Sequence, residues 1–186
     1  MTSTSSPSDT LAAWMAREAE LRGRIRGTGI ARPEQFFGLT GLQSLQAMMD
    51  GDIPFPPMSK TLDFLVVEVS PGQAVVQGRP MLAHYNPLSC VHGGWAATLL
   101  DTALACSVHT LLPVGKAYTT IELKVNYVKA LTEDVPLVRA IGNIIHQGNR
   151  TATADGRLVG PDGTLYAHAS TTCIIFDAAK GRSNAA

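Results

Sequence analysis

The chain has 186 residues, of which 45% are hydrophobic and only 16% are charged. This length favours one domain with a sizeable core, and the low charged fraction indicates that some surface is buried against other subunits. The 15 basic and 15 acidic side chains cancel, so no global field attracts nucleic acid or an anionic membrane. We expect neither partner, and an anionic ligand would have to be held by local charges.

The three cysteines are odd in number and widely spaced, at Cys90, Cys106 and Cys173. This pattern argues against a disulfide framework and a structural zinc site, so we expect no metal and reduced thiols in a cytoplasmic protein. No stretch reaches the roughly 18 unbroken apolar residues of a membrane span, and the first ten residues lack the pattern of a secretory signal.

The first forty residues are predicted to be an N-terminal extension, partly disordered and then helical. Residues 1–9 are expected to be disordered, and helical spacing of apolar residues predicts an amphipathic helix from Leu11 to near Gly23. A second short helix is plausible over residues 41–49. The segment GDIPFPPMS that follows is predicted to be a connector without helix, because of its prolines.

Residues 41–177 are predicted to form the main domain, followed by a flexible tail at 178–186. A long helix, apolar on nearly every side, is predicted from Trp95 to near Pro113. The stretch TTIELKVNYV alternates, with Ile121 and Tyr127 on the face expected to be buried. Pattern and turn residues predict five other strands, over residues 61–69, 73–79, 135–146, 151–159 and 164–176.

This order of two strands, one helix and four strands favours an α+β fold with an antiparallel sheet. A helix that is apolar all round must be covered on more than one side. The economical arrangement is a sheet wrapped around the helix, with a second copy of the chain closing the open side. We therefore expect a homodimer.

A carboxylate within this apolar helix, Asp101, is costly to bury without a partner. The preceding His92-Gly93-Gly94 turn offers helix-start N–H groups that could hold a thioester oxygen and the oxyanion it becomes; alternatively, the glycines only make a tight turn. Nine residues of helix separate His92 from Asp101 by roughly 13 Å. Two helices packed antiparallel about a two-fold axis would bring Asp101 to the Gly93 amide of the other chain.

The pattern formed by Asn86-Pro87, His92-Gly93-Gly94 and Leu99-Leu100-Asp101 resembles the signature of hotdog-fold acyl-CoA thioesterases of the phenylacetate-pathway (PaaI-like) type. The resemblance covers residues 51–176. It implies a hotdog fold, an antiparallel sheet around one long central helix, in a homodimer that pairs into a dimer of dimers, a homotetramer. It also implies hydrolysis of an acyl-CoA thioester without any cofactor beyond the coenzyme A of the substrate.

The resemblance also implies roles for individual residues. Asp101 would be the catalytic general base or nucleophile, the Gly93 N–H would polarise the carbonyl, and His92 and Asn86 would orient the thioester or water. Ala105 replaces the Ser or Thr of some relatives, so Thr102 could substitute in positioning water. The remaining substrate and coenzyme A contacts are expected from Gly94, Trp95, Lys129, His146, Gly148, Asn149 and Arg150.

Other interpretations of these residues are weaker. Cys90 and His92 could form a nucleophile pair, but no third orienting residue is apparent. His109 is expected to be a satisfied histidine at the helix end. A non-catalytic acyl-CoA-binding protein, or a hotdog-fold hydratase or dehydratase, remain alternative functions. The acyl pocket is expected to be walled by Trp95 and residues 54–58, and the Pro, Phe and Met content there suggests an aromatic or medium-length apolar acyl group.

Overall fold

The computed structural model describes residues 6–178. The helices of this part of the chain are α1 (Pro7–Arg24), η1 (Pro33–Phe36), α2 (Gly41–Met49), α3 (Pro57–Thr61), η2 (Leu82–His84) and α4 (Gly93–His109). Its strands are β1 (Phe64–Ser70), β2 (Gln73–Gly78), β3 (Lys116–Tyr127), β4 (Val138–Gln147), β5 (Thr151–Val159) and β6 (Leu165–Asp177). Within these residues no helix combines the length and apolarity needed to cross a membrane.

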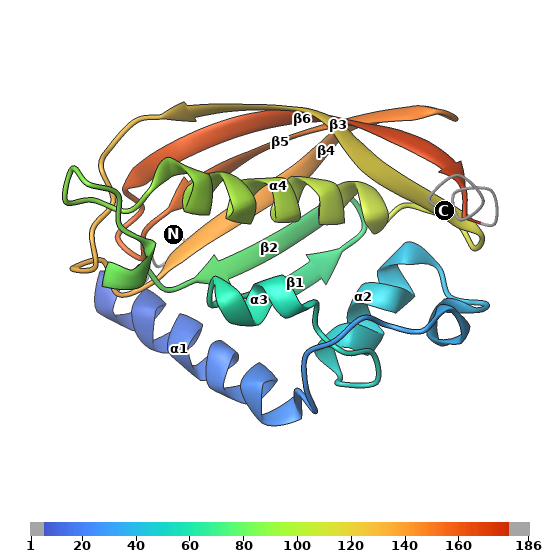
Figure 1. Cartoon of the computed structure of the whole chain (residues 1–186), viewed down its shortest axis with the longest axis horizontal. Helices are drawn as coiled ribbons and strands as arrows, with labels where there is room; N and C mark the ends of the chain where they lie inside the picture. The colour runs from blue at the N-terminus through green and yellow to red at the C-terminus, as the bar shows by residue number, and fades with distance from the viewer. Residues whose placement is uncertain (1–5, 179–186) are drawn as a thin grey trace, which may run out of the picture.

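The six strands form one antiparallel sheet in the order β1-β2-β4-β5-β6-β3, and the sheet curves around α4 (Figure 1). This confirms the predicted hotdog arrangement. The helix lies so close to the sheet that a Cβ atom added at Gly142 of β4 would stand 2.4 Å from the Ala103 carbonyl oxygen. The side chains of Leu99, Leu100 and Leu104 are fully buried in the resulting core.

Strand β3 is one edge of the sheet, and its inner face differs from the prediction. The pairing of β3 with β6 shifts between Thr120 and Glu122, so a β-bulge interrupts the alternation. Ile121, expected in the core, is 58% exposed, and Tyr127 is 57% exposed. Only Leu123 and Val125 of the predicted buried set pack against the core, and both are partly buried. The expectation that Ile121 and Tyr127 would be buried was therefore wrong.

The N-terminal extension lies on the β1 side of the sheet (Figure 1). Helix α1 begins with a capping box between Ser6 and Asp9, so residues 7–9 are helical and the predicted disorder was wrong there; residues 1–5 lie outside the described part. The Arg139 guanidinium of β4 lies 4.6 Å from the Trp14 ring of α1. Gln77 of β2 donates a hydrogen bond of 3.0 Å to the Glu18 carboxylate of α1, and these two contacts anchor the extension to the sheet.

The connector between α2 and β1 contains a short helix that the sequence interpretation excluded. Pro57 is the first residue of α3, where proline is tolerated because the first N–H groups of a helix have no intrahelical partner. The other predicted elements are confirmed with shifts of a few residues at their ends. Helix α4 starts at Gly93 instead of Trp95 and ends at His109, short of Pro113.

Candidate active site: two half-sites on one chain

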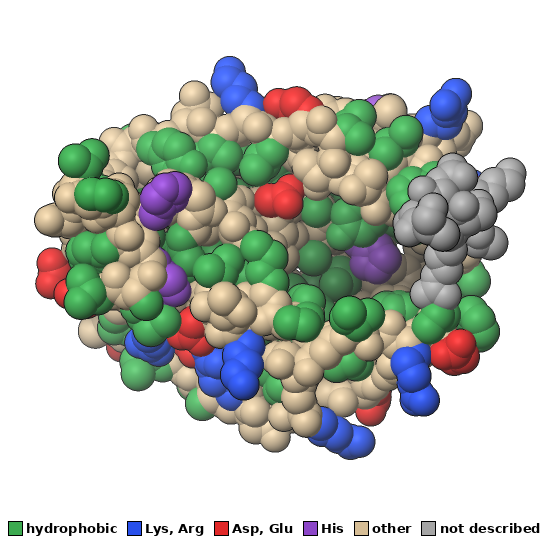
Figure 2. Space-filling model, in the orientation of Figure 1, with side chains coloured by type: hydrophobic (Ala, Val, Ile, Leu, Met, Phe, Trp, Pro, Cys, Tyr) green, Lys and Arg blue, Asp and Glu red, His purple; other side chains and the backbone are tan. Residues whose placement is uncertain are grey.

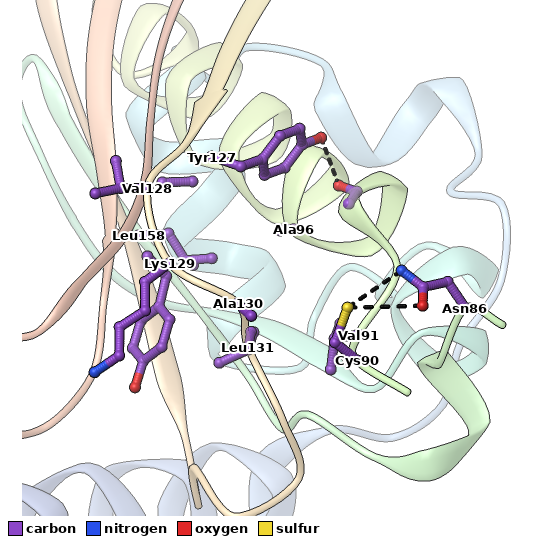
Figure 3. Close-up of a pocket in the computed structure, with 13 residues that line it drawn as sticks. Asn86, Cys90, Val91, Ala96, Tyr127, Val128, Lys129, Ala130, Leu131 and Leu158 are labelled. Carbon is purple, nitrogen blue, oxygen red and sulfur yellow. Dashed lines mark hydrogen bonds between the residues drawn. The ribbon is translucent and has the colours of Figure 1, made fainter. Parts of the chain in front are cut away.

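The start of α4 borders a cavity of about 390 Å³ (Figure 3). Asn86 and Cys90 line one side of it, and Lys129 lies on the opposite side, after the end of β3. The Tyr127 hydroxyl donates a hydrogen bond of 2.8 Å to the Gly93 carbonyl. A Cβ at Gly93 would lie 2.8 Å from the Tyr127 ring, so only glycine lets the ring seat against the helix start.

His92 is the N-cap of α4, and its Nδ1 accepts a hydrogen bond of 2.8 Å from the Gly94 N–H. An accepting Nδ1 places the proton of the neutral ring on Nε2, which can donate to a ligand. The Gly94 N–H is therefore occupied. Within the described residues the Gly93 N–H has no hydrogen-bond partner, so it is the donor at this helix end that remains for a substrate oxygen.

Asn86 holds its own loop as well as lining the cavity. Its Oδ1 accepts a hydrogen bond of 2.8 Å from the Leu88 N–H, and its Nδ2 donates to the Cys90 sulfur at 3.3 Å (Figure 3). Cys90 thus pairs with Asn86, and no contact joins it to His92 among the described residues. This geometry does not support a Cys90–His92 nucleophile pair.

Asp101 lies eight residues after Gly93 on α4 and is half-buried. Its Oδ1 accepts a hydrogen bond of 2.9 Å from the Thr120 hydroxyl of β3. The carboxylate borders an open depression formed with Thr102, Cys106 and other residues of α4 and β3. One oxygen is therefore fixed by Thr120, while the group as a whole faces space that a ligand can enter.

The thiols beside Asp101 are unsuited to nucleophilic attack. Burial raises the pKa of Cys106 to about 12, and the negative charge of Asp101 adds to this effect. Burial also raises the pKa of Cys173, whose sulfur lies 4.0 Å from the Thr120 hydroxyl. Both groups are protonated at neutral pH, and a thiol is a far weaker nucleophile than a thiolate. Asp101 is the reactive group that this depression offers.

The residues predicted to bind coenzyme A lie at opposite ends of the sheet. Lys129 follows the β3 end that pairs with Ala167. The turn with Gly148, Asn149 and Arg150 lies at the other end, because the Arg150 carbonyl accepts a hydrogen bond from Ile175, which pairs with Tyr118. Lys129 therefore lies toward the same end of the sheet as Gly93, and Arg150 toward the same end as Asp101, so we call these groups the Gly93–Lys129 and Asp101–Arg150 candidate half-sites. We use these two names below.

Three other predicted site residues contribute less directly. Trp95 is 4% exposed, donates its indole N–H to the Leu62 carbonyl and stacks on His84 at 5.0 Å, so it forms part of the core. The Thr102 hydroxyl donates to the Thr98 carbonyl at 2.8 Å. His146 is exposed on β4, outside both depressions.

The sequence interpretation missed Thr120, which orders the Asp101 carboxylate. Nineteen residues separate the two, and the local signal was only a threonine at the start of a predicted strand. Among residues 6–178 no group of three or more His, Cys, Asp or Glu side chains could hold a metal ion.

Comparison with known proteins shows which proteins this domain is similar to. Residues 88–167 match the model of the thioesterase superfamily, and they include both half-sites. A curated protein of Archaeoglobus fulgidus, named "putative esterase", is 34% identical over 92 residues, which are 50% of this chain and 57% of that protein. The match thus spans little more than half the length of this relative.

Solved structures give the same fold and a more specific likeness. A Ralstonia eutropha protein named as a putative thioesterase related to phenylacetic acid degradation is 26% identical, with a TM-score of 0.64 over 70% of this chain and 98% of that one. The phenylacetic acid degradation protein PaaI of Thermus thermophilus, solved as a mutant, is 27% identical, with a TM-score of 0.57 over 63% of this chain and 97% of that one.

Proposed function

We propose that the protein is an acyl-CoA thioesterase of the PaaI-like type, with active sites shared between the two chains of a homodimer. The observation that carries this proposal is the separation of complementary groups on one helix. Asp101 and the free Gly93 N–H are eight residues apart, which is about 12 Å along the axis. An oxyanion donor must lie about 3 Å from the reacting oxygen, so one chain alone cannot assemble the site.

A two-fold axis solves this separation. In an antiparallel pair of α4 helices, Asp101 meets the Gly93 of its partner when the axis passes near the midpoint, Ala97. The residues at this point allow close approach, because Gly94, Ala97 and Thr98 form a small, partly open strip on α4. The same operation turns the unpaired edge of β3 toward its copy, which supports a continuous sheet through the dimer.

The proposed reaction uses Asp101 as a general base. Thr120 holds one carboxylate oxygen, and the carboxylate takes a proton from a water molecule. The hydroxide attacks the thioester carbon, and the oxyanion is stabilised by the N–H of the opposite Gly93. The carbon–sulfur bond then breaks, and the proton held by Asp101 passes to the coenzyme A sulfur. The Nε2–H of His92 and the Nδ2–H of Asn86 orient the thioester from the Gly93 side.

The same symmetry explains how a neutral chain would hold an anionic nucleotide. The axis brings the Gly93–Lys129 half-site of one chain beside the Asp101–Arg150 half-site of the other. Lys129 and Arg150 then belong to one composite site, although they lie far apart in a single chain. Both are exposed, as phosphate-binding side chains at a pocket mouth should be.

The test is hydrolysis of a panel of acyl-CoA thioesters, followed with a thiol-trapping dye. Asp101→Asn should lower kcat by about 10²–10⁴-fold, the usual contribution of a general base. The variant should still bind substrate. Asp155→Asn is the matched control, because Asp155 is exposed on β5 and lines neither half-site. Binding of acyl-CoA by the wild type without hydrolysis would support the non-catalytic alternative and refute the enzyme.

A further inference from the structure

The N-terminal extension encloses a second cavity, of about 460 Å³, at the far end of α4. Its walls come from the 33–44 segment, from residues 109–118 at the end of α4 and the start of β3, and from Ala178 after β6. Most of the lining is apolar, with Phe36, Phe37, Leu39 and Val114 among its members. Figure 2 shows hydrophobic side chains spread over the middle of this face of the molecule, with Lys and Arg mostly toward its rim.

This cavity adjoins the Asp101 depression. Tyr118 lines both spaces and is the residue that they share within the described chain. Its ring lies 5.2 Å from that of His109. On α4, Asp101, Ala105 and His109 are spaced by four residues, so they follow one face of the helix. Ala105 lies between the other two on this face and carries the smallest side chain of the three.

The cavity is uncharged at neutral pH. Burial lowers the pKa of His109 to about 4, so its imidazole is neutral. Its Nδ1 is buried without a hydrogen-bond partner, which makes the expectation of a satisfied histidine wrong. The cation on the lining, Lys116, is 2.7 Å from a carboxylate oxygen of Asp177. Among the described residues, the lining thus offers apolar contact, one unsatisfied nitrogen nearby and a cation that is already paired with Asp177.

The exposed aromatic rings of the wall point to an apolar occupant. Phe37 is 73% exposed and Phe36 is 42% exposed, although each could bury more than 150 Å² in a core or a complex. A ligand in the cavity would cover the faces that line it. Eight residues of helix separate Asp101 from His109, so the ligand would extend about 12 Å from the carboxylate.

We infer that this cavity receives the acyl group of the thioester, and that the N-terminal extension therefore sets substrate specificity. The inference rests on the proposed function for the position of the thioester carbon beside Asp101. It assigns the substrate class as thioesters of medium-length or aryl-terminated apolar acids. Acids with a second carboxylate fit this lining less well, because the cation among its described residues, Lys116, is already paired with Asp177. This assignment differs from the walls expected at Trp95 and residues 54–58, because it gives that role to Phe36, Phe37 and Tyr118.

The first test compares kcat/KM for acetyl-, butyryl-, hexanoyl- and octanoyl-CoA. Burial of each methylene should raise kcat/KM about fourfold until the cavity is full. Val114→Trp, which fills the cavity, should reduce the octanoyl-to-acetyl ratio by at least tenfold. Phe37→Ala should reduce the ratio less. Ile30→Ala is the control, because Ile30 lies in the same extension, is 90% exposed and does not line the cavity.

The second test separates the cavity from the catalytic proposal. Octanoate binding to the Asp101→Asn variant is measured by calorimetry, alone and combined with Val114→Trp. If octanoate binds and Val114→Trp abolishes this binding, the assignment of the cavity is supported even when no thioester is hydrolysed. The absence of hydrolysis would then refute only the proposed function. Hydrolysis whose rate is independent of chain length, or an octanoyl-to-acetyl ratio unchanged by Val114→Trp in a correctly folded variant, would overturn the assignment.

Discussion

The shared active site predicts which mixed dimers are active. Consider a heterodimer in which one chain carries Asp101→Asn and the other carries Asn86→Asp. The second change keeps the Oδ1 that accepts the Leu88 N–H, but it removes the amide donor and adds a negative charge beside the thioester. One site of this heterodimer combines both defects, while the other combines Asp101 of one chain with Asn86 of its partner and is intact.

The magnitude follows from the geometry of α4. Because about 12 Å of helix separates the two half-sites on a chain, their residues cannot act in cis. The heterodimer should have about half of the wild-type kcat per dimer, since one of its two sites is intact. Each parent homodimer should be slower by about 10²-fold or more, the cost of losing a catalytic proton acceptor or an electrostatic contact.

The assay uses two affinity tags on co-expressed chains, so that the heterodimer is isolated before turnover is measured. The mirror experiment pairs the double variant Asp101→Asn/Asn86→Asp with a wild-type chain. A shared site predicts that this heterodimer is nearly inactive, because each of its sites carries one defect. If this pair keeps half of the activity while the first pair has none, the active site lies within one chain and the reasoning is refuted.

Three further outcomes are expected. Lys129→Glu should raise KM at least several-fold for acyl-CoA and change kcat little, because a contact to the nucleotide is similar in the ground and transition states; an unchanged KM would place the nucleotide elsewhere. Ala97→Arg should convert the dimer to a monomer in light scattering and abolish hydrolysis, and an active dimer would contradict the proposed axis. Lowering the pH from 6.5 to 4 should reduce the free energy of unfolding by a few kcal/mol through His109. The pKa of His109 is about 4 in the folded chain and the ordinary 6.5 in the unfolded chain, so the unfolded chain binds the proton first. Urea unfolding at several pH values should show a smaller loss for His109→Gln, and an identical loss would remove His109 from the effect.

Local periodicity was enough to predict the framework of the molecule. Helix α4 and the strands after it are each nine or more residues long, enough for apolar spacing to be recognised in a single sequence. The bulge between Thr120 and Glu122 was missed, because it depends on the register with β6, more than forty residues away. Helix α3 was missed because the prolines of the segment GDIPFPPMS were taken as helix breakers, although Pro57 begins a helix.

The candidate site was predictable where its residues are neighbours in the sequence. The His92-Gly93-Gly94 turn identified the helix start and its free N–H. The contact of Thr120 with Asp101 and the cavity beside His109 were not predictable, because they form between segments that only the fold brings together. The sequence also carried no indication that the N-terminal extension would wall a cavity, since residues 33–39 have no periodic pattern.

The free edge of β3 has a consequence for the newly made chain. Along the 12 residues of this strand, the edge that does not pair with β6 offers hydrogen bonds to any extended peptide. Lys124 and Glu122 project from this strand, and the bulge beside them bends it. These features discourage indiscriminate pairing and aggregation. A second copy of the same strand, running in the opposite direction, can match the charges and the bend. The edge that exposes a single chain to aggregation therefore also favours pairing with a second copy of itself.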